Sequence, residues 1–210
     1  LSPIIKVYFE MRKINWGIIG LGKMALEFAK CFSHLDNVNL KGVASQKKGN
    51  LKIFKRFGVD DKFCFNNYDD LISSRDIDII YIALPNSLHS HFINECVKKN
   101  KNCLVEKPAF INFEDLKKFK DLDKNKKIFF TEAFMYRYLP YFLKIKEIIQ
   151  NNILGNVINM KSSFNIIAYK QKNFFGLKIR KPDYSHRLFN KSLGGGAILD
   201  IGCYPLSLST

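Results

Sequence analysis

The sequence lacks the features of a membrane or secreted protein. It contains no run of eighteen apolar residues, and no short apolar stretch stands between a basic start and a small-residue cleavage site. These absences argue against a membrane span and a secretory signal, so we expect a cytoplasmic protein without a membrane partner. The five cysteines are an odd number and form no C-x-x-C pair, which argues against a disulfide framework and a structural zinc site. We therefore expect buried or idle thiols and no metal.

Arginine is also scarce. Only six of the 34 basic residues are arginine, yet their excess over 19 acidic residues gives a formal charge of +15 and a pI of about 9.6. Such a balance can indicate nucleic-acid binding. The lysines, however, are scattered in pairs and form no run of five or six. We interpret the charge as a compositional drift toward lysine and expect no nucleic-acid partner, with a nucleic-acid surface as the less favoured alternative.

Apolar runs alternate with amphipathic segments through the first 131 residues. The run from Ile14 to Ile19 precedes a glycine-rich turn and a segment of helical periodicity from Met24 to Phe32. Later helices lie between further strands, which are expected at residues 38–44, 63–65, 77–84, 103–105 and 128–130. Ser87 is expected to cap the helix after the third of these. Because strands that alternate with helices predict a parallel sheet covered on both faces, we assign residues 11–131 to a Rossmann-type, doubly wound α/β domain.

The remaining residues, 132–210, are expected to begin a second domain. Leu139 to Gln150 predicts an amphipathic helix, and Val157 to Tyr169 predicts a long strand. Another helix is expected after Gly194-Gly195-Gly196, and the chain stops within its apolar pattern. Since about 75 residues make a small domain, the expectation is an incomplete α+β substrate domain in a C-terminally truncated chain.

A G-x-G-x-x-A motif, Gly20-Leu21-Gly22-Lys23-Met24-Ala25, lies between the first expected strand and helix. This is the context that dinucleotide binding requires. Gly20 would permit a tight turn, Gly22 would let the backbone approach a pyrophosphate, and Ala25 would keep the helix close to the sheet. We predict that the motif, including Lys23 and Met24, binds a dinucleotide; the alternative is a merely structural turn.

The end of the second expected strand decides between the two nicotinamide cofactors. A carboxylate there would bind the adenosine ribose hydroxyls of NAD and repel the extra phosphate of NADP. This strand is followed by Ser45-Gln46-Lys47-Lys48, and no acidic residue occurs before Asp60. We therefore predict NADP, with Ser45, Gln46 and Lys47 as contacts and NAD as the alternative cofactor. The lysines also fit a solvated helix start.

Two further motifs carry groups suited to proton transfer. Glu106-Lys107-Pro108 follows a short strand and is expected at the carboxyl edge of the sheet, where ligands bind in open α/β folds. A lysine there can donate to an oxygen on the carbon that gains or loses hydride. Asp200 and Tyr204 are four residues apart, which places them on one helix face. We expect a nearby lysine to lower the pKa of the phenol, although each pattern alone also fits an ordinary turn or helix.

Two supporting segments complete the pattern. Pro85-Asn86-Ser87-Leu88-His89 follows the strand that ends at Leu84, and Glu132-Ala133-Phe134-Met135-Tyr136-Arg137-Tyr138-Leu139-Pro140 opens the second part. With the motifs above, over residues 13–210, they resemble the Gfo/Idh/MocA family of NAD(P)-dependent oxidoreductases, named for glucose-fructose oxidoreductase and inositol dehydrogenase. Inositol dehydrogenase-like members carry histidine where Tyr204 stands. With a tyrosine at this position, the sequence resembles the branch that contains dimeric dihydrodiol dehydrogenases and NADP-dependent xylose dehydrogenases.

The resemblance implies a role for each of these residues. Lys107 and Tyr204 would be the catalytic pair, with Asp200 orienting or tuning them. Arg137 and Arg187 would lie near the substrate, together with Asp200 and Tyr204. The cofactor-binding residues beyond the glycine motif and the second strand would be Leu84, Pro85, Asn86, His89, Glu106 and Lys107. A structural role is the alternative for His89.

The resemblance also implies the reaction, a transfer of hydride between NADP(H) and a secondary alcohol or ketone of a sugar, cyclitol or trans-dihydrodiol. The partner would be a small-molecule substrate, and the full-length chain would form a homo-oligomer. One departure concerns the cofactor, because NADP-using members often carry Ser-Arg where this chain has Ser45-Gln46. A non-catalytic, nucleotide-sensing Rossmann protein is the alternative function.

Overall fold

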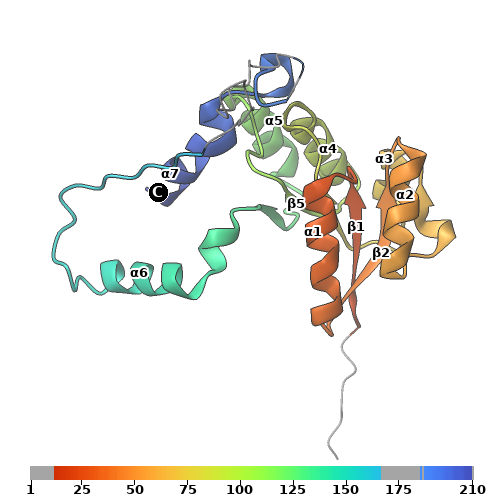
Figure 1. The fold of residues 1–210 in the computed structure, drawn as a ribbon, viewed down its shortest axis with the longest axis horizontal. Helices are drawn as coiled ribbons and strands as arrows, with labels where there is room; N and C mark the ends of the chain where they lie inside the picture. Colours follow the sequence, from red (N-terminus) through yellow and green to blue (C-terminus); the bar gives the residue numbers. More distant parts are fainter. Residues whose placement is uncertain (1–11, 167–184, 186, 210) are drawn as a thin grey trace, which may run out of the picture.

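The computed structural model describes residues 12–166, 185 and 187–209 (Figure 1). Strands and helices alternate as far as the last strand, as the sequence predicts. Their order is β1 (Ile14–Ile19), α1 (Lys23–Cys31), β2 (Val38–Ala44), α2 (Lys48–Phe54), β3 (Cys64–Phe65), α3 (Tyr68–Ser73), β4 (Ile79–Ile82), α4 (Asn86–Lys98), β5 (Asn102–Val105), α5 (Phe113–Asp123), β6 (Phe130–Glu132), α6 (Pro140–Gln150) and α7 (Cys203–Leu208).

The six strands form one sheet in the order β3-β2-β1-β4-β5-β6, and every neighbouring pair is parallel. The chain moves outward from β1 to β3 and then returns to β4 on the other side of β1. The strand order therefore reverses between β1 and β4, which is the position where open α/β sheets bind ligands. The expected Rossmann-type, doubly wound sheet is confirmed. Its division from a second domain at residue 131 stays a prediction.

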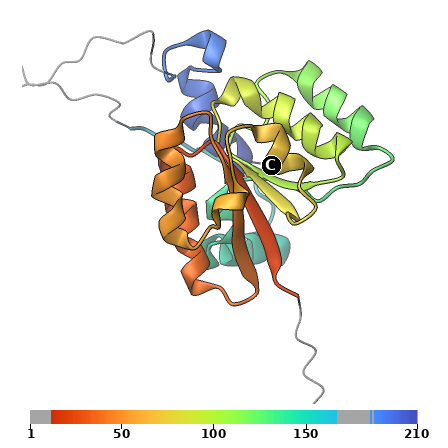
Figure 2. The ribbon, with the colours of Figure 1, turned by 90° about the vertical axis from the view of Figure 1, so that its right-hand side faces the viewer.

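Alternate residues of the central strands enter two separate cores, one on each face of the sheet. Ile18 and Tyr81 pack with α1 and α2, whereas Ile19, Ile80 and Ile82 pack with α3, α4 and α5. All five side chains are buried. Figure 2 shows the helices on either side of the strands. Because the side-chain period of a strand is two, the buried residues of β1 and β4 are apolar on both faces of the sheet.

Short polar side chains start two of the helices. Asn67 accepts a hydrogen bond from the Asp69 backbone N–H at the start of α3, and Asn112 accepts one from Asp115 at the start of α5. The expected cap at Ser87 is wrong. Helix α4 begins at Asn86 with Pro85 as its N-cap residue, two residues before the expected cap, so Ser87 lies inside the first turn and α4 has no side-chain cap.

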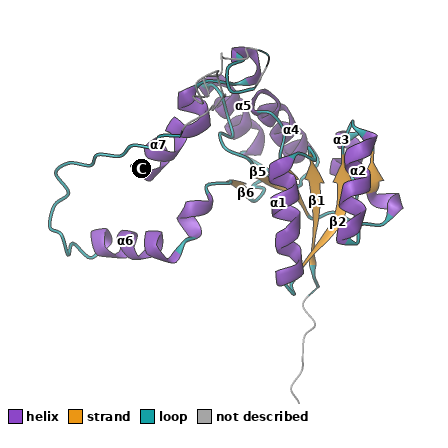
Figure 3. Ribbon diagram, in the orientation of Figure 1, coloured by secondary structure: helices purple, strands orange, loops and turns teal. Residues whose placement is uncertain are grey.

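The chain beyond β6 is mostly helix and coil. A 3-10 turn, η4 (Met135–Tyr138), leads into α6, and α7 follows a π-helical turn, η6 (Ile198–Gly202). The strand expected over residues 157–169 is wrong for 157–166, which carry no helix or strand (Figure 3), and 167–169 lie outside the described residues. Strand backbone needs a partner strand, and no other described segment pairs with this one. The incomplete α+β character of residues 132–210 stays a prediction.

Two features are absent from the residues that the structure describes. No helix there is long and apolar enough to cross a membrane. No three histidine, cysteine or acidic side chains are grouped there as a metal ion would need.

Candidate active site

The turns that follow β1, β2, β4 and β5 lie at the carboxyl edge of the sheet, because all four strands are parallel. These turns carry the predicted cofactor residues. The segment from residue 187 to α7 comes back to the same edge, where it carries Arg187, Asp200 and Tyr204. The fold therefore brings the glycine motif, near the start of the chain, to the same edge as Tyr204, near its end.

The glycine turn after β1 has the form that a dinucleotide pyrophosphate requires. Gly20 has a φ of +85°, and a Cβ there would lie 2.5 Å from the Ala83 backbone oxygen, so only glycine fits. A Cβ on Gly22 would meet nothing within 4 Å. Gly22 is the N-cap residue of α1, which has no side-chain cap and no acidic residue in its first turn. The N-terminal amides of α1, beginning at Lys23, Met24 and Ala25, are therefore open to an anion.

The turn after β2 lies next to the glycine turn. Ser45 is buried, and its hydroxyl accepts a hydrogen bond from the Lys47 backbone N–H, while the side chains of Gln46 and Lys47 are exposed. Asn50, in α2, donates from Nδ2 to the Leu21 carbonyl at 3.0 Å. This bond fixes α2, and the turn before it, against the glycine motif.

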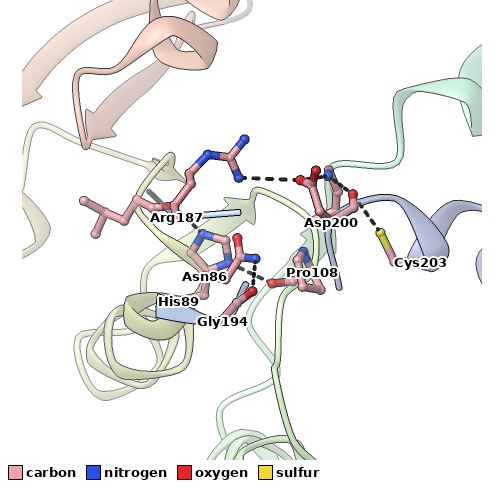
Figure 4. A network of polar contacts seen from close by, with 9 residues as sticks. Asn86, His89, Pro108, Arg187, Gly194, Asp200 and Cys203 are labelled. Atoms are coloured by element: carbon pink, nitrogen blue, oxygen red, sulfur yellow. Dashed lines mark hydrogen bonds and ion pairs between the residues drawn. The ribbon is translucent and has the colours of Figure 1, made fainter. Parts of the chain in front are cut away.

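His89 joins the turns that follow β4 and β5. Its Nδ1 lies 2.8 Å from the Pro108 carbonyl oxygen, and its Nε2 lies 2.8 Å from the Leu84 carbonyl oxygen (Figure 4). Burial lowers the pKa of His89, and the two carbonyls oppose that shift. The ring is fully buried and both nitrogens lie against backbone carbonyls, which favours the structural role. The cofactor contact of His89 stays a prediction.

Two other expected cofactor residues have partners within the protein. Tyr81 donates from its hydroxyl to Glu106 Oε1, and burial, followed by this carboxylate, raises the pKa of Tyr81. Asn86 donates from Nδ2 to the Gly194 carbonyl at 2.9 Å (Figure 4). Pro85, directly before Asn86, is exposed and lies at the start of α4.

Lys107 is the centre of the polar cluster at this edge. Its ammonium lies 3.3 Å from Asp200 Oδ1 and also donates to the Asp200 backbone carbonyl. Arg187 approaches the same carboxylate, with Nη1 at 3.5 Å from Oδ1 (Figure 4). The side chains of Lys107 and Asp200 are each 15% exposed, whereas Arg187 is 54% exposed. One carboxylate is therefore shared by two cations, and it holds the lysine at the carboxyl edge of the sheet.

Tyr204 lies beside Lys107, but the expected effect on its pKa is wrong. The ammonium lies 5.2 Å from the centre of the phenol ring, over its face. The pKa of Tyr204 is raised, first by burial and then by the nearby Glu106 carboxylate. The ring packs against Phe134 and Phe164, with centroid distances of 5.6 and 5.3 Å. A half-buried phenol among aromatic rings favours its neutral form.

A sequence comparison gives the family. Residues 14–134 match the Gfo/Idh/MocA model, described as an oxidoreductase family with an NAD-binding Rossmann fold. The chain belongs to the Gfo/Idh/MocA oxidoreductase family.

Relatives of this Gfo/Idh/MocA chain agree with the expected branch. D-xylose 1-dehydrogenase (NADP(+)) of Hypocrea jecorina is 31% identical over 92% of this chain and 51% of its own length. Trans-1,2-dihydrobenzene-1,2-diol dehydrogenase of Xenopus tropicalis is 28% identical over 93% of this chain and 56% of its own length. This chain thus spans about half the length of these relatives. A 3-ketoreductase from Actinomadura kijaniata, solved with NADP and TDP-benzene, shares the fold with a TM-score of 0.76, 23% identity and coverage of 93% and 56%.

Arg137 does not join the Lys107 cluster of this Gfo/Idh/MocA chain. Its guanidinium donates to the Ser207 backbone oxygen and hydroxyl at 3.0 and 2.9 Å, next to the end of α7. Tyr136 also donates to the Ser207 hydroxyl. Both side chains therefore hold α7 against η4, and the expectation that Arg137 meets the substrate finds no support in this contact.

Two positioning residues, Asn50 and Tyr81, were not predicted from the sequence. Asn50 carried no signal, because an amide in the first turn of a helix is common and its Leu21 partner is 29 residues away. Tyr81 did carry one, since a phenol within the most apolar strand needs a hydrogen-bond partner when buried. That partner, Glu106, lies at the end of the neighbouring strand β5.

Proposed function

We propose that this chain forms the cofactor-binding and proton-transfer part of an NADP-dependent dehydrogenase. Its substrate would be a secondary alcohol or ketone of a sugar, cyclitol or trans-dihydrodiol. The observation that carries this proposal is the position of Lys107, which stands at the carboxyl edge of a dinucleotide-type sheet and contacts both Asp200 and the Tyr204 ring.

The glycine turn and the first turn of α1 fit the cofactor. Space around Gly22 and the uncapped amides of α1 would hold the pyrophosphate. Ser45, Gln46 and Lys47 would meet the 2′-phosphate, because no acidic residue lies in that turn or in the first turn of α2. This donor set supports NADP over NAD. A bound nicotinamide would supply the hydride chemistry.

Lys107 and Tyr204 would handle the proton. Because the pKa of Tyr204 is raised, its phenol keeps its proton at neutral pH and is suited to donate to an oxygen of the substrate. The Lys107 ammonium would stabilise negative charge on that oxygen. Asp200 would hold the ammonium in place, and Arg187, more exposed, would contact the outer part of the substrate.

The names of the relatives support the substrate class. Both the xylose and the dihydrodiol dehydrogenases act, by name, on molecules with neighbouring hydroxyl groups. The set of Lys107, Asp200 and Tyr204 argues against a purely nucleotide-sensing protein, because nucleotide binding alone needs no proton donor beside a held cation. A small-molecule substrate, a homo-oligomer of the full-length protein and a cytoplasmic location belong to the same proposal.

The direct test is a titration with NADPH and then NADH, followed by nicotinamide fluorescence, with aldoses, cyclitols and trans-dihydrodiols then screened for NADP⁺ reduction. We expect NADPH to bind in the micromolar range, and more tightly than NADH. Trp16 lies against Phe28 and Phe32, in the first half of β1, so its emission reports whether the domain is folded. A folded chain that binds neither nucleotide would contradict the proposal.

A further inference from the structure

The loop from Arg187 to Gly196 is closed by its own backbone hydrogen bonds. The amides of Leu193 and Gly195 donate to the Asn190 carbonyl, and that of Gly196 donates to the Leu188 carbonyl. A Cβ on Gly195 would lie 2.4 Å from the Arg187 carbonyl oxygen, so the loop is folded tightly on itself. The loop therefore keeps its shape as a unit, and its contacts with other elements set its position.

Asn86 makes such a contact, from the first turn of α4. Its Nδ2 donates to the Gly194 carbonyl at 2.9 Å, across 108 residues of sequence. Gly194 has a φ of +74°, and a Cβ there would lie 2.7 Å from the Asn86 Cβ and 3.0 Å from Ile111. The backbone of the loop thus lies directly on the first turn of α4, at a distance that only glycine allows.

Both ends of this loop contact Asp200, one through its carboxylate and one through its backbone. Arg187 opens the loop and contacts Oδ1, and the Gly196 carbonyl accepts a hydrogen bond from the Asp200 backbone N–H. Figure 4 shows Asn86 and Gly194 on one side of this network and Arg187 and Asp200 on the other. Moving the loop would therefore move Arg187 and Asp200 relative to Lys107.

We propose that Asn86 is a positioning residue for the substrate side of the site, which acts by fixing the Arg187–Gly196 loop on α4 through the Gly194 carbonyl. It touches neither Lys107 nor Asp200 itself. The consequence for the reaction rests on the proposed dehydrogenase function, whereas the fixing of the loop does not.

The sharpest variant is Asn86→Asp, because it keeps the side-chain shape and a good helix-start residue but replaces the donor by a carboxylate that faces the Gly194 oxygen. Asn86→Ala removes the group without adding charge. Ser90→Asp, on the second turn of α4, is the control for added charge. Hydrogen–deuterium exchange of the peptide covering residues 188–196 is the main readout, together with the melting temperature.

We expect exchange in this peptide to rise about ten-fold in both Asn86 variants and to stay unchanged in Ser90→Asp. Peptides from β1 and β4 should exchange as in the unchanged protein. Once a substrate that the protein oxidises is known, its KM should rise several-fold in the Asn86 variants while their affinity for NADPH stays the same. General destabilisation would not change one without the other.

Unchanged exchange in Asn86→Asp would overturn the proposal. So would a loss of NADPH affinity without faster exchange, because that result would make Asn86 a cofactor contact. If neither the variants nor the unchanged protein binds NADPH, the proposed function fails. Faster hydrogen exchange in the Asn86 variants would still support the proposal that Asn86 fixes the loop.

Discussion

The Lys107 ammonium lies 3.3 Å from the Asp200 carboxylate, although the two residues are 93 positions apart in the sequence. Lys107 follows strand β5, and Asp200 lies in a π-helical turn that leads into α7. The ion pair therefore joins the Rossmann sheet to the C-terminal segment. It also holds the lysine at the edge where the cofactor would bind.

Replacing Lys107 by Met should abolish most turnover and leave the cofactor in place. The methionine keeps the length of the side chain but neither stabilises negative charge nor donates a proton, so we expect a rate loss of about 10²- to 10⁴-fold. NADPH affinity, measured by fluorescence titration, should change by no more than a few-fold. Lys99→Met, at an exposed lysine after α4, should keep the full rate. A Lys107→Met protein with near-normal rate would contradict the assignment.

The two glycines of the motif should respond in opposite ways to alanine. Gly20→Ala places a Cβ 2.5 Å from the Ala83 oxygen at a φ of +85°, so we expect a loss of about 1–3 kcal/mol of stability. Gly22→Ala meets open space, so its melting temperature should not fall. Its NADPH affinity should drop about ten-fold, equivalent to ~1.4 kcal/mol, because the methyl group occupies the approach to the pyrophosphate. Normal NADPH binding by Gly22→Ala would place the cofactor elsewhere.

Gln46→Asp should change the cofactor preference. A carboxylate in the turn after β2 would repel the 2′-phosphate, so NADPH affinity should fall about ten-fold while NADH affinity stays the same or improves. Asn39→Asp adds the same charge near the opposite end of β2 and should change neither. The measurement is a titration of the unchanged protein and of both variants with NADPH and with NADH. An equal effect on both nucleotides would show that this turn does not read the phosphate.

Glu132→Gln should make the protein more stable at neutral pH. Burial raises the pKa of Glu132, against the Ala109 amide and two cations that lower it, so the folded state holds this proton more tightly than the unfolded state. That contribution to stability is complete below about pH 4.5 and is lost as the pH rises through the folded pKa. Glutamine stays neutral, and its carbonyl can still accept from Ala109 N–H.

The measurement for Glu132 is the melting temperature of both proteins at pH 4 and pH 7. The variant should melt higher at pH 7, and the difference should shrink at pH 4, where the glutamate is neutral as well. Glu147→Gln, at an exposed ion pair on α6, should stay within about 0.5 kcal/mol of the unchanged protein. A Glu132→Gln protein that melts lower at pH 7 would reverse the inferred sign.

Local pattern was sufficient for most of the sheet. The apolar runs at residues 14–19 and 77–84 and the glycine motif predicted strands and turns that the structure contains, because side-chain periodicity and glycine turns depend on near neighbours in the chain. The same reasoning was wrong for residues 157–166. Their pattern suits a strand, but a strand also depends on a second strand beside it, and the pattern says nothing of that partner.

The sequence by itself determined the alternation of strands and helices, the dinucleotide motif and the residue types available for proton transfer. Only the tertiary structure decided that Lys107 pairs with Asp200, that Arg137 is bound to Ser207 and that His89 is enclosed by two carbonyls. It also reversed the expected shift of Tyr204, because the pKa depends on burial and on which charges lie near the hydroxyl. Lys107 and Asp200 are 93 positions apart and Arg137 and Ser207 are 70 apart, so these contacts follow from how whole elements pack, which no local spacing encodes.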